Sequence, residues 1–144
     1  MADMPVTPLV VQLRRIAQSI VDELVERLQA AGYTDITTAH HPVFYNLDLF
    51  GTRLTELAAR AGMTHQSMGE LVSALVELGY LERVQDPVDR RARLVVLTPH
   101  GRKAVRLARA EVADIDAEWV ERLRRAGVET DIRKAFTAAL AERG

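Results

Sequence analysis

The feature that most restricts the fold is a pair of short helical segments followed at once by two strand-like segments. Apolar residues keep helical spacing at 55–61 and again at 64–78, and Gly62 and Gly79 end the two segments. Gly62 stands at the turn between them, where a positive φ is useful. Thr64 is a suitable cap for the second segment. Together these features are typical of a helix-turn-helix.

The apolar period changes directly after the second helical segment. Residues 81–84 and 93–97 are apolar or β-branched stretches of strand length, and the polar turn 85–92 between them contains Pro87. The tip of this hairpin is basic, because it carries Arg90, Arg91 and Arg93. A helix-turn-helix followed by a two-stranded ribbon is a winged helix, so a winged helix is the predicted fold of this region.

Long apolar stripes precede and follow the predicted winged helix. A first helix has its apolar face at Leu9, Leu13, Ile16, Ile20, Leu24 and Leu28. A shorter helix is expected from Thr37 or Thr38 through Phe44 to Phe50. Thr98 and Pro99 open a long helix that runs to about Arg125, and a last helix carries Ile132, Phe136, Ala139 and Leu140. The predicted fold class is therefore mainly α with a small β wing, comprising six helices and a ribbon of two or three strands.

The outer stripes exceed what the winged helix alone can cover, and large exposed apolar patches are unusual on monomers. We therefore expect N- and C-terminal dimerisation helices around a winged helix-turn-helix. The expected regions are 1–36 for the N-terminal dimerisation helix, 37–102 for the DNA-binding region and 103–144 for the C-terminal dimerisation helices. All three belong to one compact domain per chain, as 144 residues allow. Trp119 lies on the stripe of the long helix and is expected in the core of the interface.

The distribution of charge points to the middle of the chain as the part that meets a polyanion. The whole chain has 19 Lys and Arg against 20 Asp and Glu, which excludes a basic coat over its entire surface. Residues 51–106, however, hold 9 basic and 6 acidic groups, and they form the one net positive stretch. A nucleic acid is therefore expected to dock on the winged region.

The absence of certain residues and motifs argues against several classes of function. There is no cysteine, which excludes disulfides, thiolate-bound zinc or iron–sulfur clusters and thiol redox sensing. No metal is expected, because none of His40, His41, His65 and His100 forms an i, i+4 pair on one helix. No GxGxxG, Walker loop, GxSxG or HExxH motif is present, so we expect no enzyme, no catalytic residue and no cofactor.

We expect the protein to be located in the cytoplasm. Residues 1–5 offer neither a basic start nor an apolar run, so no signal peptide is expected. No stretch approaches 18 consecutive apolar residues, so no membrane partner is expected either.

Polar side chains at the start of the second helical segment are candidates for contact with DNA. Thr64, His65, Gln66 and Ser67 are hydrogen-bonding residues at the end of a helix that can enter a major groove. The arginines of the hairpin suit phosphates and a narrow minor groove. Plain helix-start residues and an ordinary solvated turn are the alternative interpretations of these two groups.

Residues 54–102 resemble the DNA-binding core of the MarR (multiple-antibiotic-resistance regulator) family. The most specific part is Asp89-x-Arg91 followed by Leu97-Thr98-x-x-Gly101. The resemblance implies a homodimer in which the first and last helices of two chains interlock. It also implies major-groove contacts from His65, Gln66 and Ser67. Arg90 and Arg91 fall in the wing of the family, with Asp89 positioning an arginine by a salt bridge.

One residue departs from the pattern of several relatives. They carry a basic residue one turn into the recognition helix, whereas this chain has Glu70. A carboxylate facing phosphates is unfavourable, which leaves three alternatives: Glu70 pairs with a nearby arginine, reads a cytosine amino group, or points away.

The resemblance further implies an effector crevice between the dimerisation and DNA-binding regions. Arg15, His41 and Tyr45 are its candidate lining, and a small aromatic or anionic molecule is its candidate occupant. The expected function is that of a dimeric transcriptional repressor that binds a pseudo-palindromic operator in double-stranded DNA and is released by a ligand. The alternative is a winged-helix module that binds only proteins.

Overall fold

A computed structural model describes residues 6–144 of the chain, so residues 1–5 of the predicted N-terminal region 1–36 lie outside the described part. The fold is mainly helical with a small two-stranded sheet, as predicted. Its elements are α1 (Leu9–Ala30), the 3-10 helix η1 (Thr38–His40), α2 (His41–Asn46), α3 (Leu54–Ala61), α4 (His65–Glu77), β1 (Leu81–Gln85), β2 (Arg93–Leu97), α5 (Pro99–Arg125) and α6 (Ile132–Arg143).

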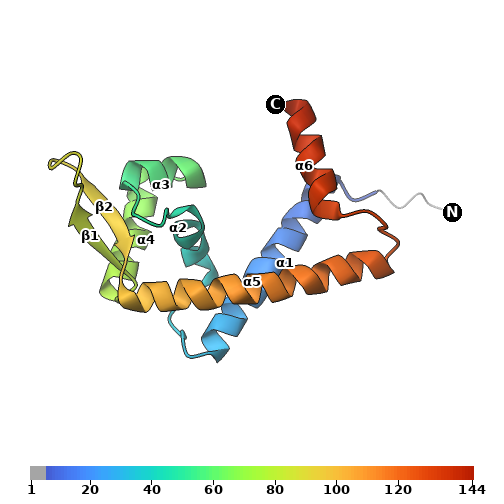
Figure 1. The fold of residues 1–144 in the computed structure, drawn as a ribbon, viewed down its shortest axis with the longest axis horizontal. Coiled ribbons are helices and arrows are strands. Elements are labelled where there is room, and N and C mark those ends of the chain that lie inside the picture. Colours follow the sequence, from blue (N-terminus) through green and yellow to red (C-terminus); the bar gives the residue numbers. More distant parts are fainter. Residues whose placement is uncertain (1–5) are drawn as a thin grey trace.

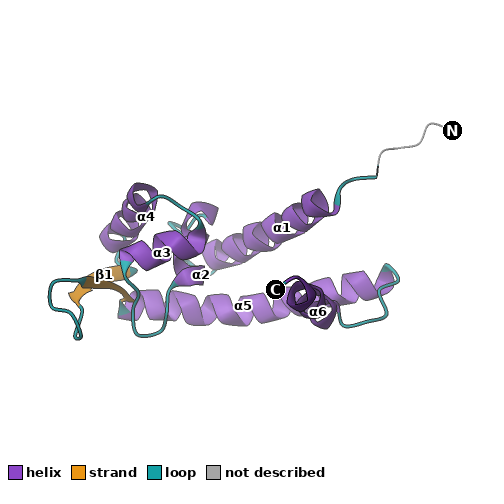
Figure 2. Ribbon diagram, turned by 90° about the horizontal axis from the view of Figure 1, so that it is seen from above, coloured by secondary structure: helices purple, strands orange, loops and turns teal. Residues whose placement is uncertain are grey.

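The molecule is elongated, and α5 runs along most of its length (Figure 1). At one end, α2, α3, α4 and the β1–β2 hairpin form the winged helix. Toward the other end α1 crosses α5, and α6 turns back from the end of α5 (Figures 1 and 2). The winged helix is thus held on a helical stem that is made by α1 and α5.

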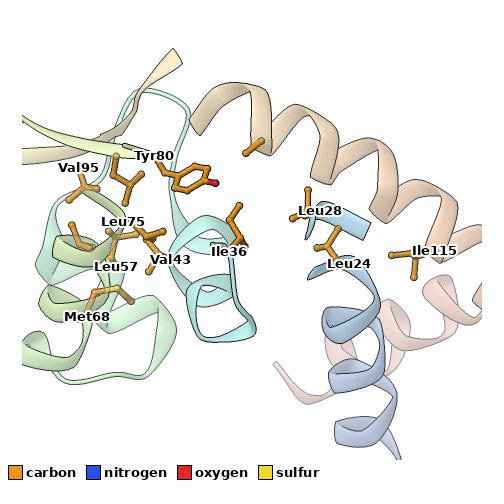
Figure 3. Close-up of a cluster of buried hydrophobic side chains, with 14 residues drawn as sticks. Leu24, Leu28, Ile36, Val43, Leu57, Met68, Leu75, Tyr80, Val95 and Ile115 are labelled. Carbon is orange, nitrogen blue, oxygen red and sulfur yellow. The ribbon is translucent and has the colours of Figure 1, made fainter. Parts of the chain in front are cut away.

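One cluster of buried side chains extends through the winged helix and the stem and holds these parts together (Figure 3). Leu57, Met68 and Leu75 fill the angle between α3 and α4 and are fully buried. Leu24 and Leu28 of α1 lie near Ile115 of α5 in the stem. The predicted inner faces of the helix-turn-helix are therefore confirmed, and Gly62 takes the left-handed conformation expected at its turn, with φ 63°.

The wing is an antiparallel pair in which the register runs from Leu81 opposite Leu97 to Gln85 opposite Arg93. An isolated bridge adds Thr52 to the other edge of β2, where its backbone exchanges hydrogen bonds of 3.0 and 2.9 Å with Val95. The ribbon thus has two full strands and one bridging residue, within the predicted range of two or three strands.

The segment expected to be one helix up to Phe50 is a 3-10 turn, a short helix and a loop. The side-chain amide of Asn46 donates to the Pro42 carbonyl (2.7 Å), and the next residue, Leu47, has extended dihedrals that end α2. The loop then runs close along the free edge of β2. Gly51 has φ 103°, and a Cβ atom there would lie 2.7 Å from Val96 Cγ1.

Thr98 and Pro99 open α5 as predicted, because the Thr98 hydroxyl accepts a hydrogen bond from the Gly101 backbone (3.0 Å). This first turn of α5 lies directly against the chain that leads into β1. The Thr98 backbone donates to the Tyr80 carbonyl (3.0 Å), and a Cβ atom at Gly101 would overlap that same oxygen. The close approach explains why a glycine stands in the first turn of a long helix.

We therefore expect Gly101→Ala to lower the free energy of unfolding by about 2–3 kcal/mol, because two backbone segments must separate to admit one methyl group. Gly69→Ala is the matched control. Its added Cβ would meet only Leu54 Cδ2 at 3.6 Å, so it should be neutral or stabilising by ~0.5–1 kcal/mol. Urea unfolding followed by circular dichroism measures both, and equal effects of the two substitutions would contradict the proposed clash.

Candidate nucleic-acid interface

The start of α4 is fixed by a cap that occupies two of the predicted contact residues. Thr64 Oγ1 accepts a hydrogen bond from the Ser67 backbone (3.0 Å) and donates its own proton to Ser67 Oγ (2.9 Å). Met68, Val72 and Leu75 then anchor the helix in the core. Because Thr64 and Ser67 are engaged with each other, His65 and Gln66 are the freer groups at this helix end.

The outer face of α4 is polar and exposed, and α4 contains no lysine or arginine. It carries His65, Gln66, Glu70, Ser73 and Glu77. Gln66 lies one turn before Glu70, and its amide nitrogen is 3.5 Å from Glu70 Oε1, a marginal hydrogen bond. Within residues 6–144, Glu70 has no arginine or lysine at salt-bridge distance. The structure therefore does not support the alternative in which Glu70 pairs with a nearby arginine.

One cation that sequence reasoning missed lies beside this face. Arg83 of β1 reaches across to α4, where its guanidinium donates to Ser73 Oγ (2.9 Å). The two elements enclose a shallow groove that is lined by Gln66, Glu70, Glu77 and Arg83, among others. No pattern in the sequence links residue 83 to residue 73, because the contact depends on how β1 leaves α4.

The arginines predicted to contact DNA lie on the surface of the wing tip. Arg90, Arg91 and Arg93 are all exposed, and across the described part of the chain none of them has a carboxylate within 4.0 Å. Asp89 Oδ1 accepts a hydrogen bond from the backbone of Arg91 (3.1 Å), while its other oxygen lies 3.9 Å from Arg53 Nη2. Asp89 thus shapes the tip, and the arginine side chain near it is Arg53 at the start of α3.

Asp86 is the main link between the wing and the helix-turn-helix, and sequence reasoning did not single it out. One of its oxygens accepts from Arg53 Nε (3.1 Å) and Nη2 (2.8 Å), and the other from the Val88 backbone (2.9 Å). The Val88 N–H first, and the Arg53 guanidinium next, lower the pKa of Asp86. An aspartate before a proline is a turn signal, but its partner lies 33 positions earlier.

Asp86→Asn is expected to destabilise the fold at neutral pH and to change its response to acid. A carboxyl group with a lowered pKa adds stability above its ordinary pKa, about 3.9, and loses it as the pH falls through the lower folded value. The difference in unfolding midpoint between wild type and variant should therefore be largest near pH 7 and shrink below pH ~4. Urea midpoints across this pH range measure it, and a constant difference would contradict the role assigned to the charge.

A cavity of about 570 Å³ lies between the winged helix and the stem. Its walls come from α1, α2, the loop after α2 and α5, and they include Leu24, Phe44 and Val112. Of the three predicted pocket residues, His41 and Tyr45 line it, with ring centroids 5.6 Å apart, whereas Arg15 does not. Burial lowers the pKa of His41, which favours the neutral ring.

The loop after α2 connects this cavity to both parts of the winged helix. Arg60 of α3 donates to the Asn46 carbonyl (2.8 Å) and to Asp48 Oδ2 (2.9 Å). The Asp48 backbone donates to Thr52 Oγ1 (2.8 Å), and Thr52 is the residue that bridges to β2. The segment after α2 is thus hydrogen-bonded both to α3 and to the residue that bridges to β2.

The remaining candidates fall outside these two sites. His40 is buried, and its Nδ1 accepts a hydrogen bond from the Thr37 backbone (3.0 Å).

Among residues 6–144 there is no group of three or more His, Asp or Glu side chains that could hold a metal ion. Within the same residues, no helix is long and apolar enough to cross a membrane. Trp119 is partly buried, and Arg122 lies 5.1 Å from the centre of its ring.

Comparison with known proteins confirms the resemblance that the sequence predicted. A family model described as MarR family matches residues 34–92, which include the helix-turn-helix, β1 and the turn that follows β1. A search of curated proteins found no match.

Solved structures with the same fold include MarR-type regulators. RV1404 from Mycobacterium tuberculosis has a TM-score of 0.69 at 24% identity, covering 92% of this chain and 89% of that one. The transcriptional repressor CouR bound to a 23-mer DNA duplex has a TM-score of 0.68 at 24% identity, with 94% and 91% covered. CouR from Rhodococcus jostii RHA1 bound to p-coumaroyl-CoA has 0.69 at 22%, with 92% and 89% covered. A MarR transcriptional regulator from Methanosarcina mazei Go1 has 0.64 at 24%, with 93% and 89% covered.

Proposed function

Because this chain carries a MarR-family winged helix at residues 34–92 and has the fold of MarR-type regulators, we propose that it is a dimeric, sequence-specific DNA-binding regulator of transcription. The observation that carries the proposal is the pairing of an exposed polar face on α4 with exposed wing arginines that have no carboxylate at salt-bridge distance within residues 6–144. We assign His65, Gln66 and Glu70 to base edges in a major groove, and Arg90, Arg91 and Arg93 to the backbone or the minor groove.

The charges on α4 and on the wing indicate different roles for these two surfaces in DNA binding. The α4 face contributes two carboxylates, so the electrostatic attraction for DNA must come mainly from the wing and from Arg83. Thr64 and Ser67 act through the cap, which fixes the start of α4. Glu70, which has no cation at salt-bridge distance in the described chain, is suited to accept a hydrogen bond from a cytosine amino group.

Dimerisation is proposed from apolar side chains that the protomer itself leaves exposed. The N-terminal part of α1 exposes Leu9, Val10 and Leu13, and α6 exposes Phe136 and Leu140. No residue of α6 is buried. A second copy that packs its own α1 and α6 against these faces would cover them and would present two copies of α4 to the DNA.

A repressor that a ligand releases is the form of regulation we propose. The cavity lies between stem and winged helix, and its rim is the loop that Arg60 and Thr52 join to α3 and β2. A ligand that favours one position of this loop biases the spacing of α4 and the wing. CouR, which has a similar fold, is known in complexes with both DNA and p-coumaroyl-CoA, which supports a site of this kind.

The test of the proposal is selection of bound duplexes from a random DNA library, followed by titration of the selected duplex and of a scrambled one. We expect a pseudo-palindrome whose half-sites are centred one helical turn apart, ~10 bp. Preference over scrambled DNA should reach at least ~10³-fold near physiological salt. No enrichment, or equal affinity for both duplexes, would contradict DNA recognition and favour a module that binds only proteins.

A further inference from the structure

The cavity between the winged helix and the stem is long as well as large. Its lining includes residues of α5 from Arg102 to Val112, a helical path of about 15 Å at 1.5 Å per residue. The side chains that α1 contributes are Leu24, Val25 and Leu28, which are all apolar and buried. Its volume of about 570 Å³ lies within the range of ~300–1,000 Å³ that holds drug-sized ligands. A single aromatic ring would leave most of this length unfilled.

Three arginines follow the same path along α5. Arg102, Arg106 and Arg109 are exposed residues that line the cavity at successive turns of the helix. Within residues 6–144 none of them has a carboxylate within 4.0 Å, and Arg102 is hydrogen-bonded to the Leu97 carbonyl (3.0 Å). Arg106 and Arg109 are therefore the cations that are available to an anion at the mouth.

The other charged and titratable groups of the lining do not neutralise this row. Asp48 is the one carboxylate in the lining, and it accepts a hydrogen bond from Arg60 (2.9 Å), which lies outside the cavity. The hydrogen bond from Arg60 lowers the pKa of Asp48 and thus keeps this pair ionised. His41, the one histidine of the lining, is half-buried and stacks on the ring of Tyr45. The mouth is consequently cationic while the interior is apolar.

We propose that the cavity binds an elongated amphipathic anion, whose apolar body lies between α1 and α5 and whose terminal carboxylate or phosphate contacts Arg106 and Arg109. The inference deepens the proposed effector site and rests on it. The length of the apolar path argues against a one-ring acid, and the unpaired cations argue against a neutral lipid. Tyr45 and Leu49, which line the cavity and are exposed, would cover the part of the body nearest solvent.

The test is calorimetric titration of the DNA-free protein with a matched set of probes below their micelle concentrations. The probes are decanoate, decyl phosphate, methyl decanoate, hexanoate and benzoate. We expect decanoate or decyl phosphate to bind at least tenfold more tightly than methyl decanoate, which keeps the chain and lacks the charge. The better of the two anions identifies the head group. Benzoate or hexanoate binding as tightly as decanoate would overturn the elongated body, and equal binding of the ester would overturn the anion site.

Substitutions test which residues contact the charged head and the apolar body of the ligand. Arg106→Ala with Arg109→Ala should weaken decanoate binding at least tenfold while leaving that of methyl decanoate unchanged. Lys103→Ala is the control, because Lys103 is an exposed cation of the same helix that does not line the cavity. Ala108→Phe, which fills the cavity, should weaken both probes. An unchanged affinity of the double variant would overturn the inference. Since DNA is absent, probe binding without any operator binding would instead contradict only the proposed function.

Discussion

A chain with Phe136→Asp and Leu140→Asp is expected to be a folded monomer that binds operator DNA at least a hundredfold more weakly than the wild type. Both side chains lie on one face of α6, a helix without a buried residue, so the substitutions leave the protomer's own core intact. They place carboxylates in the apolar interface that we propose for the dimer. A dimer engages two half-sites at once, and that linkage is worth about 10²–10⁴ in affinity.

Size-exclusion chromatography with light scattering measures the mass, and circular dichroism checks the fold. Lys134→Asp is the control, because it adds a carboxylate to the opposite face of the same helix. Ile115 is unsuitable for this test, since it is fully buried within one protomer between α1 and α5. A wild-type protein that is monomeric at micromolar concentration, or a double variant that remains dimeric, would contradict the dimer.

Local rules account for most of the secondary structure. The caps at Thr64 and Thr98 and the left-handed Gly62 depend on residues within a few positions of one another, and the two strands pair directly across the turn that joins them. Those predictions are confirmed for that reason. The prediction of a helix up to Phe50 is wrong, because side-chain and loop contacts end α2 at Asn46. The side chain of Asn46 closes α2 onto Pro42, and the next residues run along the edge of β2, where Gly51 lies too close to Val96 for a larger residue.

Periodicity in α1 predicted an apolar face but not what covers it. Leu24 and Leu28 of that face are buried against α5, whereas Leu9 and Leu13 are exposed in the protomer. Arg15 lies on the same helix and away from the cavity, because only the C-terminal turns of α1 reach α2. Sequence spacing fixes which residues share a helix face, whereas the crossing point of two helices depends on packing along their whole length.

The wing and the candidate effector site were harder to predict because their key contacts are distant in sequence. Arg53 and Asp86 are 33 residues apart, and Arg60 reaches back to Asp48 through a loop whose path depends on Gly51. Arg102, Arg106 and Arg109 share helical spacing in the sequence, but no local pattern there indicates a binding site. The cavity that they line forms only when α1 and α2 are placed against α5.

Arg91→Ala is expected to weaken binding to operator and to random DNA alike. Arg91 is exposed on the wing without a carboxylate at salt-bridge distance among residues 6–144, and we assign it to a phosphate or to the minor groove. Each lost phosphate contact reduces the slope of log K against log salt by about one unit, hence by about two in a dimer. Arg125→Ala removes the same charge at the far end of α5 and should leave the slope unchanged.

Gln66→Ala is expected to act differently in kind, because Gln66 is assigned to a base edge. The salt slope should stay close to that of the wild type, and preference should relax at one base pair in each half-site by ~1–3 kcal/mol. Its weak hydrogen bond to Glu70 (3.5 Å) costs little to break, so the fold of α4 is preserved. Salt titrations of each variant on operator and random DNA separate the two roles. If Arg91→Ala kept the wild-type slope while Gln66→Ala weakened both duplexes equally, the assignment of phosphate contacts to the wing and base contacts to α4 would be reversed.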